Sequence, residues 1–144
     1  MLAILFTLWC GISLAQPAAT NPAKVRFVAV DIFVNSSDKP LAAYQLEFSV
    51  TNGVAKIVGI EGGGHPAFRE PPFYDPMAMQ SERVIIAAFS THKQLPTGKS
   101  RVATIHLQVS GTAEPVILLR QQAAADPKGE NLSAKTSFEI VVKK

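Results

Sequence analysis

The chain has 144 residues, with 14 basic and 11 acidic side chains and a net charge of +3 at pH 7. The charges are spread without a block of one sign, a pattern too weak for a nucleic-acid-binding surface, so no nucleic-acid partner is expected. The single cysteine excludes an intramolecular disulfide, and the length predicts one domain.

The first 15 residues have the pattern of an export signal. An apolar run from Leu2 to Ala15 is too short to span a bilayer, and it ends in small residues at the two positions that a signal peptidase reads. We therefore predict cleavage after Ala15, a proline-containing tether over residues 16–24 and a folded domain over residues 25–144. No second apolar span follows, so the product is expected to be secreted, extracellular or periplasmic, and without a membrane anchor.

The next part of the chain reads as a series of β-strands. Residues 24–34 are rich in β-branched and aromatic side chains and end at a cluster of turn formers, Asn35 to Pro40. Residues 41–50 alternate between apolar and polar positions, as expected of a half-buried strand. Asn52-Gly53 is a two-residue hairpin signal, and residues 54–60 supply the return strand, so these strands are predicted to form a meander.

Residues 61–82 interrupt this pattern with three glycines and four prolines, so no continuous strand is expected there. Asp75 followed by Pro76 matches an N-cap with proline at the first helical position and predicts a single helical turn. An irregular connection of this length is uncommon in a compact domain and is often functional.

This loop is the predicted binding site, because aromatic rings, a guanidinium and an imidazole gather within ten residues: His65, Phe68, Arg69, Phe73 and Tyr74. Such a set suits either stacking on sugar or contact with a protein. The alternative is that Phe68 and Phe73 fold back and cap one end of the core.

Residues 83–109 are predicted to form two long strands joined at a Pro-Thr-Gly turn, with the other strands laid against this pair. Residues 84–89 are apolar on both faces, which is typical of a strand that is covered on each side. In residues 102–109 a mixed face alternates with a wholly apolar one. Further strands are predicted over residues 114–122 and 134–142. Short strands at this spacing, without helical periodicity, predict an antiparallel β-sandwich of about seven to nine strands.

Four segments occur in order along the chain: Leu41 to Phe48; Val54 to Ile60; Val84 to Thr91; and Leu95-Pro96-Thr97-Gly98 leading into Val102 to Leu107. Together they resemble a cohesin-type domain, from the jelly-roll group of carbohydrate-binding and adhesin-like modules. The resemblance covers most of residues 25–142. It implies a non-catalytic sandwich whose relatives bind dockerin domains on a sheet face, or polysaccharide on a related fold. The loop after Glu61 has no match in the family pattern, so no partner-contact residue is transferred.

The motifs predict no metal site. The histidines occur in no zinc-ligand spacing: His65, His92 and His106. Oxygen donors that could suit calcium surround Gly129, namely Asp126, Glu130 and Asn131. Turns select these residue types for backbone reasons, so a solvated turn is favoured and calcium binding stays open.

No enzyme is expected, because the chain has no nucleophile elbow and no phosphate-binding loop between a strand and a helix. Glu70 and Asp75 could act as a pair of catalytic carboxylates only at a separation that a loop does not fix. The predicted function is an exported binding module for a protein partner in an assembly, with polysaccharide binding as the alternative and a small hydrolase third. No cofactor is predicted, and the oligomeric state is left open.

Overall fold

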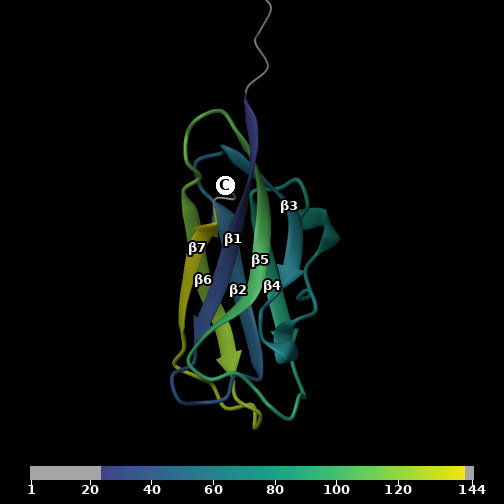
Figure 1. Cartoon of the computed structure of the whole chain (residues 1–144), viewed down its shortest axis with the longest axis vertical. Coiled ribbons are helices and arrows are strands. Elements are labelled where there is room, and N and C mark those ends of the chain that lie inside the picture. The colour runs from purple at the N-terminus through teal and green to yellow at the C-terminus, as the bar shows by residue number, and fades with distance from the viewer. Residues whose placement is uncertain (1–23, 142–144) are drawn as a thin grey trace, which may run out of the picture.

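The computed structural model describes residues 24–141, so the predicted signal segment and nearly all of the tether lie outside the described residues. Within these residues seven strands form two antiparallel sheets that pack face to face, which confirms the predicted β-sandwich (Figure 1). The strands are β1 (Val25–Asn35), β2 (Ala43–Val50), β3 (Ala55–Gly62), β4 (Arg83–Phe89), β5 (Lys99–Ser110), β6 (Ile117–Ala125) and β7 (Lys135–Val141). Sheet A has the order β3-β5-β1-β7, and sheet B has the order β4-β2-β6.

Successive strands alternate between the two sheets, with odd-numbered strands in sheet A and even-numbered strands in sheet B. The predicted hairpin at Asn52-Gly53 is therefore wrong, because β2 pairs with β4 and β6 while β3 pairs with β5. The Asn52 side chain instead bonds the connection that leads into β6. Its amide donates to the carbonyl of Glu114 (2.9 Å) and accepts from the N–H of Val116 (3.1 Å). The turn thus crosses one end of the sandwich instead of closing a hairpin.

The two strands predicted around the Pro-Thr-Gly turn also lie in different sheets. β5 is an inner strand of sheet A between β1 and β3, and its predicted apolar face is fully buried at Ile105, Leu107 and Val109. β4 is an edge strand of sheet B, so the prediction that both its faces are covered is wrong. Its residues Val84 and Ile86 enter the core, while the alternate side chains face outward.

The core lies between the sheets and is made of alternate side chains from both, with Ile32 of β1 and Phe48 of β2 fully buried. Tyr44 is a buried phenol in this core, and the half-buried Tyr74 packs against the same core. The hydroxyl of Tyr44 donates to the carbonyl of Val102 (3.1 Å), and burial raises its pKa above the ordinary tyrosine value.

The loop of residues 63–82 lies along one side of the sandwich, beside β3 and β4 (Figure 1). Its glycine-rich start passes very close to other backbone. A methyl group on Gly62 would lie 1.9 Å from the carbonyl oxygen of Arg69, and one on Gly63 would lie 2.1 Å from that of Arg101. The N–H of Gly63 donates to the carbonyl of Phe68 (2.6 Å). Only residues without a side chain fit these two positions.

Two short 3-10 turns shape the rest of the loop, η1 (Pro66–Phe68) and η2 (Pro76–Ala78). The second confirms the predicted single turn, since the carboxylate of Asp75 accepts from the N–H of Met77 (2.9 Å). None of the helical turns within residues 24–141 has the length and apolar character needed to cross a membrane.

Candidate binding site

The outward face of sheet B has a floor of small apolar side chains at one end. In one row of the sheet, Ala43 of β2 lies between Phe89 of β4 and Ala125 of β6. In the next row, Gln45 of β2 lies between two further alanines, Ala87 and Ala123. The alanine side chains project little from the sheet, so another protein chain can come close to the backbone of sheet B at this end.

Phe73 from the loop stands at the edge of this floor. Its backbone exchanges two hydrogen bonds with Ala87, of 2.8 and 2.9 Å, so the loop is fixed to the free edge of β4. The rings of Phe73 and Phe89 lie nearly parallel, with 6.3 Å between centroids and 13° between planes. Both rings are open to solvent, with exposed fractions of 70% and 69%.

Together these residues enclose a hollow of about 250 Å³, which we name the phenylalanine hollow. It is lined by Ala43, Tyr44, Gln45, Phe73, Ala87, Ala88, Phe89, Ala123 and Ala125. Most of its lining is apolar, and its position is fixed by three strands and the bonded loop.

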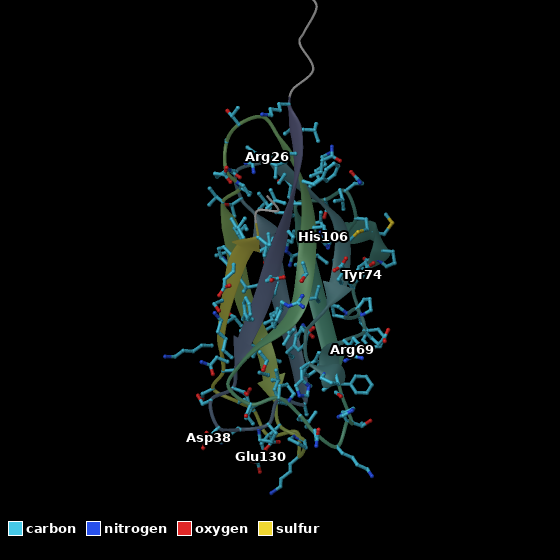
Figure 2. The ribbon with its side chains drawn as sticks, viewed as in Figure 1. Arg26, Asp38, Arg69, Tyr74, His106 and Glu130 are labelled. Carbon is cyan, nitrogen blue, oxygen red and sulfur yellow. The ribbon has the colours of Figure 1, made fainter. Side chains whose placement is uncertain are left out.

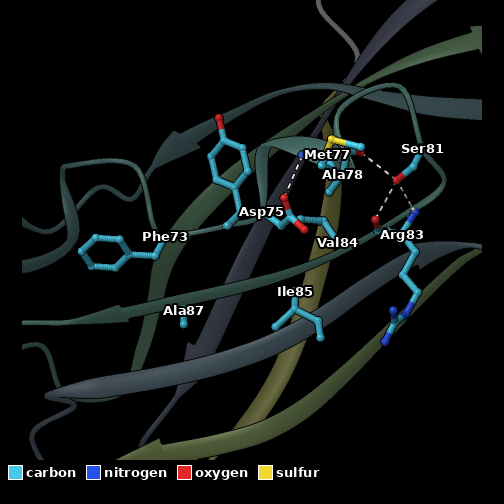
Figure 3. Close-up of a pocket in the computed structure, with 10 residues that line it drawn as sticks. Phe73, Asp75, Met77, Ala78, Ser81, Arg83, Val84, Ile85 and Ala87 are labelled. Atoms are coloured by element: carbon cyan, nitrogen blue, oxygen red, sulfur yellow. Dashed lines mark hydrogen bonds between the residues drawn. The ribbon is translucent and has the colours of Figure 1, made fainter.

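A second depression continues from the hollow on the other side of Phe73. It has a volume of about 660 Å³ and runs between β4 and the segment that contains η2. Figure 3 shows Phe73 at one end and Arg83 at the other, with Ile85 and Ala87 of β4 along its length. Met77, which also lines it, is 85% exposed. The exposed apolar side chains therefore form one continuous region, and such regions commonly mark an interaction site.

A chain of polar side chains starts at Gln45, in the lining of the hollow, and runs away from it across sheet B. The amide of Gln45 donates to Gln122, the amide of Gln122 donates to Glu47 (3.3 Å), and Arg83 also donates to Glu47 (2.8 Å). The hydrogen bond from Arg83 holds the pKa of Glu47 below its ordinary value, although partial desolvation opposes this effect. These side chains therefore keep their charges and hydrogen bonds near neutral pH.

The outward face of sheet A is different, because charged and polar side chains dominate its centre. Thr104 donates to Asp31 (2.6 Å) and accepts from Arg101 (2.6 Å), and His106 lies 3.1 Å from Glu61. Arg101, Thr104 and Asp31 are thus hydrogen-bonded to one another within the chain, whereas the Nε2 of His106 is buried beside Glu61 without a hydrogen bond. The apolar face of sheet B is therefore the better candidate for binding.

The loop residues predicted to bind separate into two groups. Phe73 and Tyr74 line the depression described above, with Tyr74 half-buried. Phe68 is buried at 3% exposure and meets the ring of Tyr44 edge-on at 5.3 Å, so for this residue the alternative of capping the core is confirmed. For Phe73 the alternative is wrong, because its ring is exposed.

The remaining two predicted residues belong to the turn η1. The imidazole of His65 accepts from the N–H of Ala67 (3.1 Å) and caps the turn, while Arg69 is exposed at its end. Figure 2 shows Arg69 and Tyr74 on the side of the sandwich that the loop occupies. Neither His65 nor Arg69 lines the hollow or the adjoining depression.

Phe89 was not predicted as a site residue. The run of residues 84–89 is apolar at every position, and this pattern predicts a strand that is covered on each side, with no exposed ring. The signal that could have identified it is the set of alanines at outward positions of β2 and β6, because a strand surface without large or polar side chains is suited to contact.

The turn around Gly129 is held by the side chain and the backbone of Asp126. The carboxylate of Asp126 accepts from the N–H groups of Lys128 and Glu130, both at 2.9 Å, and Gly129 has a φ of 80°. This arrangement is that of a turn stabilised by an aspartate. Between residues 24 and 141, no three His, Cys, Asp or Glu side chains gather as metal ligands would.

Comparison with protein-family models, with curated proteins and with solved structures gave no match.

Proposed function

We propose that this chain is an exported, non-catalytic binding module that receives an apolar side chain of a protein partner in the phenylalanine hollow. The observation that supports this most is the pair of exposed, nearly parallel rings of Phe73 and Phe89 above a floor of alanines. Protein interfaces concentrate their binding energy in a few aromatic residues around a desolvated pocket with a polar border. The hollow and the Gln-Glu-Arg side chains that extend from it have this composition.

The rigidity of the site supports recognition without rearrangement. The floor belongs to three hydrogen-bonded strands, and Phe73 is held by two backbone bonds to β4. A partner would therefore not have to order the site before binding, which lowers the entropic cost of association. The resemblance to cohesin-type domains, whose relatives bind a protein on a sheet face, agrees with this proposal.

Two properties of the loop favour binding over catalysis. The carboxylate of Asp75 is used to cap η2, and Glu70 is exposed at the end of η1. A catalytic pair of carboxylates needs a fixed separation across a substrate bond. Asp75 lines the adjoining depression, but Glu70 lines neither that depression nor the phenylalanine hollow, so the two carboxylates do not meet in one cavity.

The second candidate is binding of a single polysaccharide chain at the same site. It is favoured by the angle of 13° between the two rings, because sugar rings stack on flat aromatic faces, and by the amide of Gln45 in the lining and that of Gln122 bonded to it. It is placed second because the hollow offers few polar groups to the hydroxyls of a sugar, and an unpaired hydroxyl in an apolar site weakens binding.

The test is a peptide selection followed by measured affinities. A random peptide library is selected on the immobilised chain, and the enriched peptides are titrated by calorimetry against the wild type, Phe73→Ala and Phe89→Ala. The matched control is Phe27→Ala, since Phe27 is 73% exposed but belongs to β1 of sheet A. We expect peptides with a shared aliphatic or aromatic anchor and at least about tenfold weaker binding in the two hollow variants only.

The same variants are titrated with cellohexaose, xylohexaose and mannohexaose. Binding of one of these sugars, lost in both hollow variants and kept in Phe27→Ala, would replace the protein proposal with the second candidate. Peptide binding that is equally strong in all four proteins, or no binding of any probe, would refute the phenylalanine hollow as the site.

A further inference from the structure

The two sheets have four edge strands, β3 and β7 in sheet A and β4 and β6 in sheet B. Of these, β7 has the fewest backbone partners on its outer edge. The other three edge strands each have a backbone partner outside their sheet. Ile57 of β3 bonds with residues 80–81, Ala87 of β4 with Phe73, and Ala124 of β6 with Leu132. In the described part of the chain, β7 has backbone hydrogen bonds to β1 alone. It therefore presents a row of unpaired N–H and C=O groups on its other side.

The core-facing side chains of β7 are incompletely covered. Phe138 pairs with Ile32 and Ile140 pairs with Val30, so all four residues face the space between the sheets. The two β1 residues are fully buried, whereas Phe138 and Ile140 are 37% and 38% exposed. β7 has no proline, no bulge and no charged side chain on its core-facing side, and its two charged residues, Lys135 and Glu139, lie on the outward face.

We propose that β7 pairs antiparallel with β7 of a second copy of this chain, across a two-fold axis at Ser137. In this register Lys135 of each copy lies opposite Glu139 of the partner subunit, and Thr136 lies opposite Phe138 of the partner subunit. Residues directly opposite on neighbouring strands have their Cβ atoms about 5 Å apart, which is close enough for an ion pair. Because the two copies are related by symmetry, each dimer gains two such ion pairs.

The charges of β7 fit a second copy of the same strand. Lys135 is exposed and forms no ion pair within residues 24–141, and Glu139 is exposed beside Lys99, whose amine lies 2.6 Å from its carboxylate. A carboxylate accepts several hydrogen bonds, so Glu139 can bind Lys99 of its own chain and Lys135 of the partner subunit together. The pairing would join two four-stranded sheets into one of eight strands and would leave the phenylalanine hollow, on sheet B, open in both copies.

The interface is small, because it involves one seven-residue strand from each copy. We therefore expect a weak dimer, which is measurable by sedimentation equilibrium of the full chain over roughly micromolar to millimolar concentrations. Lys135→Glu gives a strand with two acidic residues, and Glu139→Lys gives a strand with two basic residues. Each variant alone would place like charges opposite one another twice in the dimer. The matched control for Lys135→Glu is Lys128→Glu, which makes the same change of net charge in the turn after β6.

We expect each β7 variant to dimerise at least about tenfold more weakly than the wild type, and the control to be unchanged. An equal mixture of the two β7 variants should form a heterodimer at least as tight as the wild-type dimer, because every opposed pair is then attractive. That rescue also shows that both variants are folded. The proposal is overturned if the chain stays monomeric at all concentrations, if the β7 variants associate as the wild type does, or if the mixture shows no rescue.

Discussion

The glycines at the start of the loop allow a sharp test of how the loop is fixed to the sandwich. Replacing Gly63 by alanine would place a methyl group 2.1 Å from the carbonyl oxygen of Arg101 and 2.8 Å from the Cα of Val102. Both neighbours are backbone atoms of the inner strand β5, so no flexible side chain can move aside. The two segments would have to separate by about 1 Å to reach an acceptable contact.

The expected loss follows from that separation. Overpacking of a well-packed region typically costs about 1–3 kcal/mol. The movement would also weaken the backbone bond from the N–H of Gly64 to Arg101, which is 3.1 Å long, and such a bond contributes about 1 kcal/mol. We expect Gly63→Ala to lower the free energy of unfolding by about 2–4 kcal/mol.

Gly64→Ala is the matched control at the neighbouring residue. A methyl group on Gly64 would meet only the guanidinium of Arg101, at an ordinary distance of 3.6 Å, so this variant should keep wild-type stability or gain up to about 1 kcal/mol. Urea unfolding monitored by far-ultraviolet circular dichroism measures both. A difference between the two variants below about 0.5 kcal/mol would refute the close approach of the loop to β5.

Three further predictions concern other parts of the described chain. Tyr44→Phe leaves the buried carbonyl of Val102 without its donor, so the free energy of unfolding should fall by about 1–3 kcal/mol, and unchanged stability in urea would contradict the buried bond. Because the pKa of Glu47 is lowered in the folded state, its pairing with Arg83 stabilises the fold above the ordinary glutamate pKa of about 4.3 and is lost as the pH falls through the lowered value. The acid limb of a urea-midpoint profile should therefore be shallower in Glu47→Gln, and identical profiles would count against the pair. Asp126→Ala removes the acceptor of two backbone N–H groups in its turn and should cost about 0.5–2 kcal/mol, whereas Asp126→Asn should retain most of the stability in the same assay.

The strands and the fold class could be predicted from the sequence because side-chain alternation is a local property. The alternation of residues 102–109 gave the buried face of β5 correctly, and the turn formers marked most connections. Strand pairing could not be predicted in the same way. Asn52-Gly53 has the local chemistry of a hairpin, but the two strands that it joins face each other across the core.

The sequence predicted Phe73 and Tyr74 of the candidate site but not Phe89, because the site, like the strand pairing, depends on contacts between distant segments. A sequence does not distinguish an exposed phenylalanine from a buried one. The burial of Phe68 and the exposure of Phe73 are set by the way the loop packs Phe68 against Tyr44. Phe89 becomes a neighbour of Phe73 only because the loop pairs with the edge of β4 at Ala87. The hollow depends on contacts between segments that are distant in the chain, and local patterns contain no information about them.

The alternation of strands between the sheets has a consequence for how the chain folds. Between β1 and β7 no two consecutive strands are hydrogen-bonded to each other, so this part of the chain offers no local hairpin as a nucleus. β1 and β3 each pair with β5, which follows them in the sequence only after the loop and β4. Neither strand can therefore form its hydrogen bonds to β5 before these segments have been synthesised. Folds that depend on such distant pairings form in milliseconds to seconds, far more slowly than proteins with mainly local contacts. During that interval the apolar strands of the N-terminal half are unprotected, so the yield of folded protein should depend more on chain concentration than on the final stability of the sandwich.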